Sequence, residues 1–498
     1  MTNKPIVWTI SGGDCSGGAG IAADIKTGHV LGVEVCHLLT ANTVQNSTKL
    51  VTVNAVNVNI LAQQAKVLLA DKCPNIIKIG LVVNGEQMAF IVQLISQLRK
   101  TLADLKVVYD PVGSASVGGE LSEMNSKQRM LLLSAADVLT PNLNEAQQLS
   151  GLNEESVMAK LASKLSCLGV NTVIVKGGHL GDDHCVDFCL HQLANKQHIS
   201  YQLSSAKIST QYSHGGGCSF AMAIASHLAH GYLIRDAFSL AKAFINQGLA
   251  VNQQKNTYYG AFEQSLLPVQ KQYFPQVIDD INTKYSELPA FNGLGIARGS
   301  DTPLGLYPVV DSIAWLKRLL PMGLQIIQLR LKHDCQQTLA VEIAEAVSLS
   351  QQFTTRLFIN DHWQLAITCG AYGVHLGQED LYTADLASIH RAGARLGIST
   401  HGCYEFLLAQ QLAPSYLAIG AIFPTKTKDM TGQVQGIYNL RQTLNLSSNI
   451  PVVAIGGINH QRAAQVWQTG VDSIGVVSAI TEAENPEQAI KKFQQVLV

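Results

Sequence analysis

The sequence has few charged residues and contains no dense run of lysine and arginine. Asp, Glu, Lys and Arg make up 14% of its 498 residues, and the formal net charge is −1 at pH 7. This argues against nucleic acid or an acidic membrane surface as a partner. No apolar run is long enough to span a membrane, and the run that ends before Gly12 is too short for the core of a signal peptide. We therefore expect a cytoplasmic protein.

Disulfide spacing is also lacking. The ten cysteines are scattered over the whole chain, so we expect reduced thiols. Apolar residues make up 47% of the composition, which disfavours disorder, and the chain is too long for a single hydrophobic core. The sequence therefore predicts two or three folded domains.

In the first half, residues 1–265, short β-branched runs alternate with helical stretches. This alternation predicts an α/β domain with a mainly parallel sheet and helices on both faces. The expected strands lie at residues 6–10, 76–79, 106–109, 138–139 and 172–175, and a long apolar helix is expected at 219–230. Residues 266–304 are irregular and contain several prolines and glycines, and we expect a linker and an N-terminal extension of the next domain there.

The second half, residues 305–498, has a more regular pattern. Eight successive βα units in roughly two hundred residues predict a (β/α)8 TIM barrel. The eight short apolar strands are expected to begin at residues 305, 324, 356, 372, 395, 416, 451 and 473. Polar residues gather where these strands end, which is the end of such barrels that carries the chemistry.

The early barrel strands carry cations and carboxylates. Gln328, Arg330 and Lys332 share one strand face, because side chains alternate along a strand. Two cations at the barrel mouth suit a phosphate or diphosphate, and Asp361 and Asp380 at the same rim suit a bridging Mg2+. The residues alone leave a second interpretation equally open, in which these carboxylates pair with the cations as a structural network.

The later strands are followed by loops suited to a phosphate. Residues 424–428 contain hydroxyl groups and lysines, a glycine pair at 456–457 follows the seventh strand, and small residues at 476–479 follow the eighth. Backbone N–H groups after the last two strands form the usual phosphate site of these barrels. The sequence therefore predicts two anionic groups in the barrel, a diphosphate with metal and a separate phosphate.

Seven motifs of the second half occur together in one order. They are Tyr307-Pro-Val-Val-Asp311, Gln328-Leu-Arg-Leu-Lys332, Phe358-Ile-Asn-Asp361, Gly373-Val-His-Leu-Gly-Gln-Glu-Asp380, Gly397-Ile-Ser-Thr-His401, Phe423-Pro-Thr-Lys-Thr-Lys428 and Ala454-Ile-Gly-Gly-Ile458. With these motifs, the chain from about Leu306 to its end resembles thiamin-phosphate synthase.

This resemblance implies a reaction that joins hydroxymethylpyrimidine diphosphate to a thiazole phosphate and releases pyrophosphate. It further implies that the pyrimidine and its diphosphate are bound by Gln328, Arg330, Lys332 and Asn360, with Ser399 near the reacting pyrimidine, and that Mg2+ is bound by Asp361 and Asp380. The phosphate groups would be received by Thr425, Thr427, Lys428, Gly457, Val477 and Ser478.

In the first half, a glycine triplet precedes the long apolar helix. Gly215, Gly216 and Gly217 stand where backbone N–H groups at a helix N-terminus can bind a phosphate. The same helix field predicts a lowered pKa for the thiol of Cys218, which could then take the proton of an attacking alcohol. A tight turn beside a buried small residue is an open alternative.

Further polar residues follow other strands of this half. Asn142 and Glu145 could lie near a nucleotide-bound Mg2+, and Lys176 could meet ATP phosphates. The motifs that contain or accompany these residues are Ser11-Gly-Gly-Asp-Cys-Ser-Gly-Gly-Ala-Gly-Ile-Ala-Ala-Asp-Ile-Lys26, Val44-Gln-Asn46, Lys78-Ile-Gly80, Asp110-Pro-Val112, Thr140-Pro-Asn142, Val175-Lys-Gly-Gly-His179 and Gly215-Gly-Gly-Cys218.

With these motifs, residues 4–265 resemble hydroxymethylpyrimidine/phosphomethylpyrimidine kinase, a family with the ribokinase-like three-layer α/β/α fold. The resemblance implies that Asp24 and Gln45 recognise the aminopyrimidine ring, that Lys176 binds ATP phosphates and that Cys218 is the base. Three departures stand out: the usual Gly-Thr-Gly-Cys is Gly-Gly-Gly-Cys here, the usual flap lysine is missing from residues 113–118, and the usual opening Ala-Gly-Ser-Asp is Ser-Gly-Gly-Asp. A weak pyrimidine-binding module or a pyridoxal-type kinase therefore stays open as an alternative.

The two resemblances fit one another. One chain would phosphorylate hydroxymethylpyrimidine and its monophosphate with ATP, and would then couple the diphosphate to thiazole phosphate. We expect Mg2+ as cofactor, ATP as co-substrate and these small molecules as partners. We also expect a homodimer, which is common for the kinase fold.

Overall fold

The computed structural model of the chain describes residues 4–46, 49–113, 121–152, 157–177, 183–253, 260–265, 267–296, 298–300, 303–333, 335–425, 434–447 and 449–497. The chain divides into two compact units, Met1–Ile278 and Asp279–Val498. None of the helices in the described ranges is long and apolar enough to cross a membrane.

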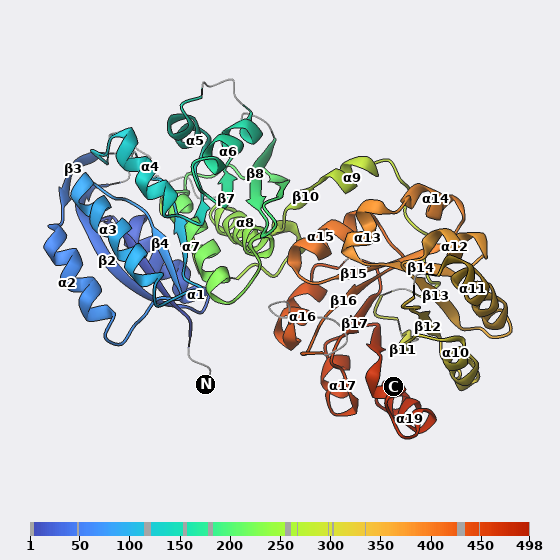
Figure 1. Cartoon of the computed structure of the whole chain (residues 1–498). Helices are drawn as coiled ribbons and strands as arrows, with labels where there is room; N and C mark the ends of the chain where they lie inside the picture. The colour runs from blue at the N-terminus through green and yellow to red at the C-terminus, as the bar shows by residue number, and fades with distance from the viewer. Residues whose placement is uncertain are drawn as a thin grey trace. The chain divides into compact units, whose positions relative to one another are not determined.

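The first unit is built on a ten-stranded sheet (Figure 1). Its strands are β1 (Ile6–Gly13), β2 (Glu34–Gln45), β3 (Leu50–Ala55), β4 (Ile76–Ile79), β5 (Lys106–Tyr109), β6 (Val138–Leu139), β7 (Thr172–Val175), β8 (His184–Gln192), β9 (His198–Ala206) and β10 (Gln276–Ile278). Their spatial order is β10-β9-β8-β7-β6-β5-β4-β1-β2-β3. The strands from β2 to β7 in this order pair in parallel, whereas β3 at one edge and β8, β9 and β10 at the other are antiparallel to their neighbours.

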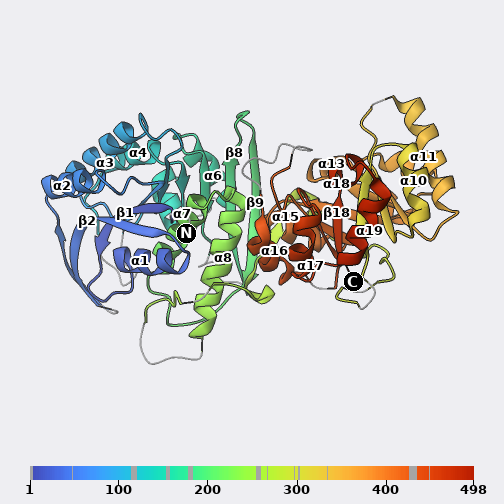
Figure 2. The same cartoon turned by 90° about the horizontal axis from the view of Figure 1, so that it is seen from below.

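Helices cover both faces of this sheet. One face carries α1 (Gly20–Val30), α7 (Gly216–Ala229) and α8 (Ile234–Val251). The other face carries α2 (Val58–Leu68), α3 (Gly85–Leu98), α4 (Ser126–Ser134), α5 (Leu143–Ser150) and α6 (Met158–Ser166). Figure 2 shows the sheet between these two layers. The apolar sequence of α7 follows from its place, because it packs against α1, α8 and the strands β4 and β5.

The stretch that the sequence assigned to a linker contains regular structure. β10 pairs with β9 and adds a strand to the first sheet. A 3-10 turn, Lys271–Tyr273, lies just before β10. After β10 comes α9 (Asp280–Lys284), whose N-cap residue Asp279 accepts a hydrogen bond from Ile281 N. β10 has three residues, of which Val277 alone is buried. A single buried position in a stretch with several prolines does not show the alternation that predicts a strand.

The second unit is a TIM barrel, as the sequence predicts. Its strands close in the order β11-β12-β13-β14-β15-β16-β17-β18, and every neighbouring pair is parallel. They are β11 (Gly305–Val310), β12 (Ile326–Leu329), β13 (Arg356–Asn360), β14 (Gly373–Leu376), β15 (Arg395–Thr400), β16 (Tyr416–Ile419), β17 (Val452–Ile455) and β18 (Ser473–Val476).

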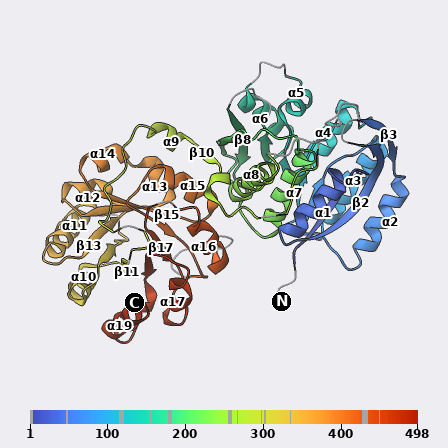
Figure 3. The same cartoon turned by 180° about the vertical axis from the view of Figure 1, so that it is seen from behind.

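Helices surround these strands, as Figure 3 shows from behind. They are α10 (Ile313–Leu319), α11 (Gln336–Ser350), α12 (Trp363–Thr368), α13 (Gln378–Thr383), α14 (Leu386–Arg391), α15 (Cys403–Gln411), α16 (Gly436–Leu444), α17 (His460–Trp467), α18 (Ser478–Thr481) and α19 (Pro486–Val496), with a 3-10 turn at Leu320–Met322. Because helices lead back from one strand to the next, the carboxyl ends of all eight strands meet at one rim.

The amino-terminal half of the barrel interior is filled by large side chains that need glycine neighbours. Phe358 and Tyr416 pack in one core cluster with Leu294, which precedes the barrel. A Cβ atom on Gly373 would lie 2.4 Å from a ring carbon of Phe358, and one on Gly397 would lie 2.2 Å from a ring carbon of Tyr416. These two glycines therefore leave room for the rings.

We predict that Gly373→Ala lowers the free energy of unfolding of the barrel by about 1–3 kcal/mol, because the added methyl group overpacks the site. Urea unfolding followed by tryptophan fluorescence measures this, since three of the four tryptophans, Trp315, Trp363 and Trp467, lie in the second unit. The control is Gly293→Ala, where a Cβ atom would meet nothing within 4 Å. Equal unfolding midpoints for the two variants would contradict the prediction.

Candidate active sites

Two lysines with carboxylate partners, one fully buried and one half-buried, lie at the centre of the first unit. Lys78, in β4, is fully buried, and its Nζ lies 2.9 Å from Oδ2 of Asp24 in α1, which also accepts a hydrogen bond from Thr9. Lys176 follows β7, and its Nζ lies 3.1 Å from Oδ1 of Asp110, which follows β5. Parallel strands bring their carboxyl ends to one edge of the sheet, and this places both cations there.

Lys176 stays charged in this setting. Burial lowers its pKa, but the carboxylates of Asp110 and Glu145 outweigh burial and raise it above the usual value. A Cβ atom on Gly217 would lie 3.6 Å from the Nζ of Lys176, so the lysine faces the glycine loop. This geometry brings the predicted phosphate-binding residues of two different segments together.

Cys218 lies in the first turn of α7, as predicted, but the expected lowering of its pKa is wrong. Burial raises the pKa of the thiol to about 11, and Asp110 and Asp24 raise it further, while Lys78 acts in the opposite direction. The helix field is too weak to offset desolvation of the thiolate at this depth. The group is therefore a thiol at neutral pH.

Asp14 and His214 connect two glycine-rich loops that lie 200 residues apart. Nε2 of His214 lies 2.8 Å from Oδ2 of Asp14, and the Asp14 carboxylate also accepts hydrogen bonds from the backbone N–H groups of Gly18 and Ala19. A Cβ atom on Gly215 would lie 1.8 Å from the carbonyl oxygen of Gly18. The sequence reasoning gave neither Asp14 nor His214 a role, although Asp14 stands in a quoted motif and His214 directly precedes one.

Asn142 and Glu145 perform a local structural task. They form the capping box of α5, in which Asn142 Oδ1 accepts from Glu145 N and Glu145 Oε2 accepts from Asn142 N. Burial raises the pKa of Glu145 to about 7, although the positive charge of Lys176 opposes this. Glu145 thus lies close to Lys176 and Asp110, but its carboxylate is already used by the backbone.

The two predicted pyrimidine contacts differ in accessibility. Asp24 is completely buried in its contacts with Lys78 and Thr9. Gln45 is half-buried at the end of β2, and its backbone bonds to the thiol of Cys15 rather than to the lysine pairs. Asp24 is therefore part of the buried cluster whose charges act on Cys218, whereas the described bonds of Gln45 are made with Cys15.

In the barrel, Gln328 is a buried side chain with an unused donor. It is 4% exposed in β12, and its Nε2 has no hydrogen-bond partner among the described residues. Arg330 follows the same strand and is half-buried. Lys332 is exposed, with its Nζ 3.5 Å from Oδ2 of Asp311. An unpaired buried N–H group is costly, so this amide donor is a site where a hydrogen-bond acceptor would be stabilising.

Each of the two predicted metal ligands takes part in a hydrogen bond with a described residue. Asn360 donates its side-chain N–H to Asp361, which has a positive φ of 63°. Oδ2 of Asp380, in the first turn of α13, accepts from Gly377 N at 3.2 Å. Among the described residues, Lys332 pairs with Asp311 rather than with Asp361 or Asp380.

Ser399 is held by a residue that the sequence reasoning did not single out. Its Oγ lies 2.8 Å from Nε2 of His375 in the neighbouring strand, and its carbonyl oxygen accepts from Nε2 of Gln378. His375 stands in the quoted motif at 373–380. Period two places it on the interior face of β14, and this was the available signal.

The predicted phosphate loops are partly described. Gly457 follows β17 with a positive φ of 64°, and a Cβ atom there would lie 2.6 Å from the carbonyl oxygen of Pro424. This close approach brings the loop before Thr425 against the loop after β17. Val477 and Ser478 follow β18 and begin α18. Thr427 and Lys428 lie outside the described residues.

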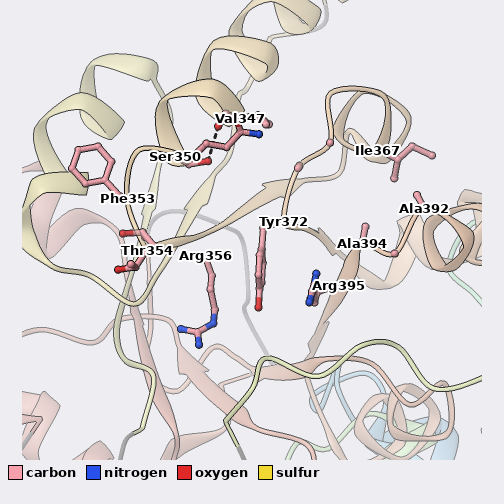
Figure 4. A pocket seen from close by; sticks show the side chains of 15 residues that line it. Val347, Ser350, Phe353, Thr354, Arg356, Ile367, Tyr372, Ala392, Ala394 and Arg395 are labelled. Atoms are coloured by element: carbon pink, nitrogen blue, oxygen red, sulfur yellow. Dashed lines mark hydrogen bonds between the residues drawn. The ribbon is translucent and has the colours of Figure 1, made fainter.

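One cavity lies at the opposite end of the barrel. It has a volume of about 460 Å³, and Arg356, Tyr372 and Arg395 are among its lining residues (Figure 4). Arg356 and Arg395 begin β13 and β15, so the cavity lies at the amino ends of the strands. The carboxyl ends of α11, α12 and α14 border the cavity, and the negative ends of their helix dipoles stabilise the charges of Arg356 and Arg395. The presence of two cations there therefore does not require a bound anion.

Together these features define a three-layer α/β unit and a TIM barrel, with charged and polar side chains gathered at the carboxyl ends of the parallel strands in both. Residues 14–263 match the phosphomethylpyrimidine kinase family and residues 306–480 match the thiamine monophosphate synthase family, so the chain belongs to both families. It is a bifunctional enzyme of thiamin biosynthesis with a kinase and a pyrophosphate-releasing transferase. The kinase match favours this function over the two alternatives left open by the sequence.

Curated relatives match the second half. The thiamine-phosphate synthase of Serratia proteamaculans (strain 568) is 52% identical over 194 residues, which are 39% of this chain and 92% of that protein. The thiamine-phosphate synthase of Yersinia pestis is 52% identical over 186 residues, which are 37% of this chain and 86% of that protein.

Solved structures match each half separately. Phosphomethylpyrimidine kinase from Clostridium difficile 630 is 31% identical with a TM-score of 0.41, and the match covers 49% of this chain and 99% of that one. Pyridoxal kinase from Staphylococcus aureus in complex with AMP-PCP is 28% identical with a TM-score of 0.48, covering 55% and 97%. Thiamine phosphate pyrophosphorylase from Pyrococcus furiosus is 30% identical with a TM-score of 0.36, covering 39% and 96%.

We predict that Cys218 reacts slowly with iodoacetamide at pH 7, because a pKa of about 11 leaves little thiolate. Its rate should rise about tenfold per pH unit up to that pKa. Cys335 is an internal reference, since it is exposed and hydrogen bonds from Thr338 lower the pKa of its thiol. Peptide mass spectrometry of a time course measures both rates, and equal labelling at pH 7 would contradict the effect of burial.

Proposed function

We propose that the first unit phosphorylates hydroxymethylpyrimidine and then its monophosphate with ATP, and that the second unit couples the diphosphate to thiazole phosphate. The observation that carries this proposal is the presence of both families in one chain, since the product of the first is the substrate of the second. The proposed kinase domain spans residues 1–265 and the proposed synthase domain 305–498, with 266–304 between them.

In the kinase, the backbone N–H groups of Gly215–Gly217 hold the transferred phosphoryl group at the start of α7. Lys176, fixed by Asp110, neutralises charge on the ATP phosphates. The hydroxyl oxygen of the pyrimidine attacks phosphorus, the bond to ADP breaks, and Cys218 takes the hydroxyl proton. Cys218 must first lose its own proton to bulk water, and the charge of Lys78 favours this thiolate.

Gln45 is the proposed contact for the pyrimidine ring, because it is accessible at the end of β2. The carboxylate of Asp24 is fully buried, so Asp24 supports the pyrimidine site indirectly, through its ion pair with Lys78. Asn142 and Glu145 support the nucleotide site through the start of α5 and through the charge of Glu145 on Lys176.

In the synthase, the pyrimidine diphosphate is bound near Gln328, Arg330, Lys332, Asn360 and Ser399. The unused Nε2–H of Gln328 supports a polar contact there. The thiazole phosphate is received by Thr425, Gly457, Val477 and Ser478. Thr427 and Lys428 are assigned to the same phosphate site from the sequence.

Asp361 and Asp380 fit Mg2+ by the chemistry of their donor set. Both offer carboxylate oxygen, which Mg2+ prefers, and the described residues contain no group of three His, Cys, Asp or Glu side chains that could hold a metal ion. Two protein carboxylates suit a magnesium ion that takes its other ligands from substrate phosphates and water. When bound, Mg2+ would neutralise the charge of the departing diphosphate.

The coupling step requires little covalent chemistry from the protein. The bond between the pyrimidine methylene carbon and the diphosphate oxygen breaks, and the diphosphate keeps the electron pair. The thiazole nitrogen then supplies the pair for the new C–N bond. Arg330 and Lys332 stabilise the negative charge on the departing diphosphate. The diphosphate site and the thiazole phosphate site together hold the two substrates in line for bond formation.

We further propose a homodimer. The edge strand β3 and its neighbour β2 expose Val51 and Val44, which are 61% and 46% exposed. Apolar side chains on an unpaired sheet edge support association of two copies.

A variant experiment separates the two activities. With hydroxymethylpyrimidine, ATP, Mg2+ and thiazole phosphate, Lys176→Ala should lower thiamin phosphate formation at least about a hundredfold, because it removes charge stabilisation. Supplying the pyrimidine diphosphate should restore it. Asp361→Asn should lose the product with either input. Product is measured by liquid chromatography.

The matched controls are Lys164→Ala and Glu379→Gln, which change exposed residues of the same charge as Lys176 and Asp361. Both should form product at the rate of the unchanged chain. The proposal is wrong if Lys176→Ala stays inactive with the supplied diphosphate while remaining folded, or if Asp361→Asn keeps full coupling activity.

A further inference from the structure

A chain of four side chains crosses the interior of the barrel. The hydroxyl groups of Tyr307 in β11 and Tyr416 in β16 lie 2.7 Å apart, and the Tyr416 hydroxyl lies 2.7 Å from Nδ1 of His375 in β14. Nε2 of His375 lies 2.8 Å from Oγ of Ser399 in β15. The chain connects the buried interior to the residue that we place near the reacting pyrimidine.

Packing fixes the geometry of this chain. Tyr416 is fully buried, Tyr307 is 2% exposed and His375 is 6% exposed. The rings of His375 and Tyr416 are stacked, with centroids 5.6 Å apart and planes inclined by 20°. A Cβ atom on Gly397 would lie 2.5 Å from the Tyr416 hydroxyl, so the missing side chain there gives this hydroxyl its place.

The direction of the hydrogen bonds follows from the buried end. Burial raises the pKa of both tyrosines, so both phenols keep their protons. A buried O–H group needs an acceptor, and among the described residues the hydrogen-bond partner of the Tyr307 hydroxyl is Tyr416 alone. Tyr307 therefore donates to Tyr416, whose own proton then goes to Nδ1 of His375.

This direction selects one tautomer of His375. In a neutral imidazole one nitrogen accepts and the other donates, so acceptance at Nδ1 places the proton on Nε2. Nε2–H then donates to Oγ of Ser399. The proton of Ser399 is not used within the chain and can point toward the rim.

We propose that Tyr307, Tyr416 and His375 are positioning residues that turn the Ser399 hydroxyl into a hydrogen-bond donor to the departing diphosphate. This inference rests on the proposed function of the barrel. The oxygen of the leaving group gains negative charge as the C–O bond breaks, so a donor aimed at it binds more strongly in the transition state. If the hydrogen bond between Ser399 and His375 had the opposite direction, Ser399 would donate its proton to Nε2 of His375 and could only accept a hydrogen bond from the substrate.

The test is a double-mutant cycle with supplied pyrimidine diphosphate and thiazole phosphate. Tyr416→Phe removes one hydroxyl and should lower kcat about tenfold, because one directed hydrogen bond is lost. KM for the pyrimidine diphosphate should change by less than about twofold, because the lost contact is made in the transition state. In the Ser399→Ala background, Tyr416→Phe should have no further effect.

A second pair of variants tests the donor itself. His375→Gln keeps an amide N–H near the position of Nε2 and should retain more activity than His375→Leu. Tyr372→Phe is the matched control, because Tyr372 lies at the amino ends of the strands, outside the chain. It should leave kcat unchanged.

The inference is overturned if Tyr416→Phe lowers kcat by the same factor with and without Ser399, or if it raises KM alone. If Tyr416→Phe does not fold, Tyr307→Phe takes its place in the same cycle with the same criterion. An unchanged chain that cannot couple the supplied diphosphate would instead contradict the proposed function of the barrel.

Discussion

The first unit depends on how the charges of Lys78 and Lys176 are balanced inside the protein. Each ammonium group has one carboxylate partner, Asp24 at 2.9 Å and Asp110 at 3.1 Å, and both pairs lie at the carboxyl edge of the sheet. Removing one partner of the fully buried pair of Lys78 and Asp24 would cost about 3–5 kcal/mol, because the remaining charge would have no compensation. Burial raises the pKa of Cys218, and Asp110 and Asp24 raise it further, so the carboxylates that keep the lysines charged also help to keep the cysteine a thiol.

The barrel interior contains a chain of hydrogen-bonded side chains. It holds the hydroxyls of Tyr307 and Tyr416 and the imidazole of His375. Lys332 lies at the rim, where water and substrate phosphates can reach it. Because each buried polar group of the chain has a hydrogen-bond partner, the chain avoids the cost of unpaired buried groups and fixes the direction of the bond to Ser399.

The sequence predicts the repeating architecture well, since eight βα units and a parallel sheet follow from periodicity over many residues. It does not reveal β2, β3, β9 or β10, and for β10 the reason is that three residues at a sheet edge carry too little pattern. It places Cys218 at the start of α7 but misjudges its pKa, because desolvation depends on Asp24 and Asp110 from distant segments. Likewise, His375 and Tyr416 are 41 residues apart in sequence, and only barrel closure shows that they share a hydrogen bond.

The most direct test is the stoichiometry of the complete reaction catalysed by the unchanged chain. Phosphorus NMR of a mixture of hydroxymethylpyrimidine, ATP, Mg2+ and thiazole phosphate would follow every phosphate at once. If both units act in sequence, two molecules of ADP and one of pyrophosphate form for each molecule of thiamin phosphate. Absence of thiamin phosphate from these inputs, while supplied pyrimidine diphosphate is still coupled, would contradict the kinase assignment and leave the barrel as the one active unit.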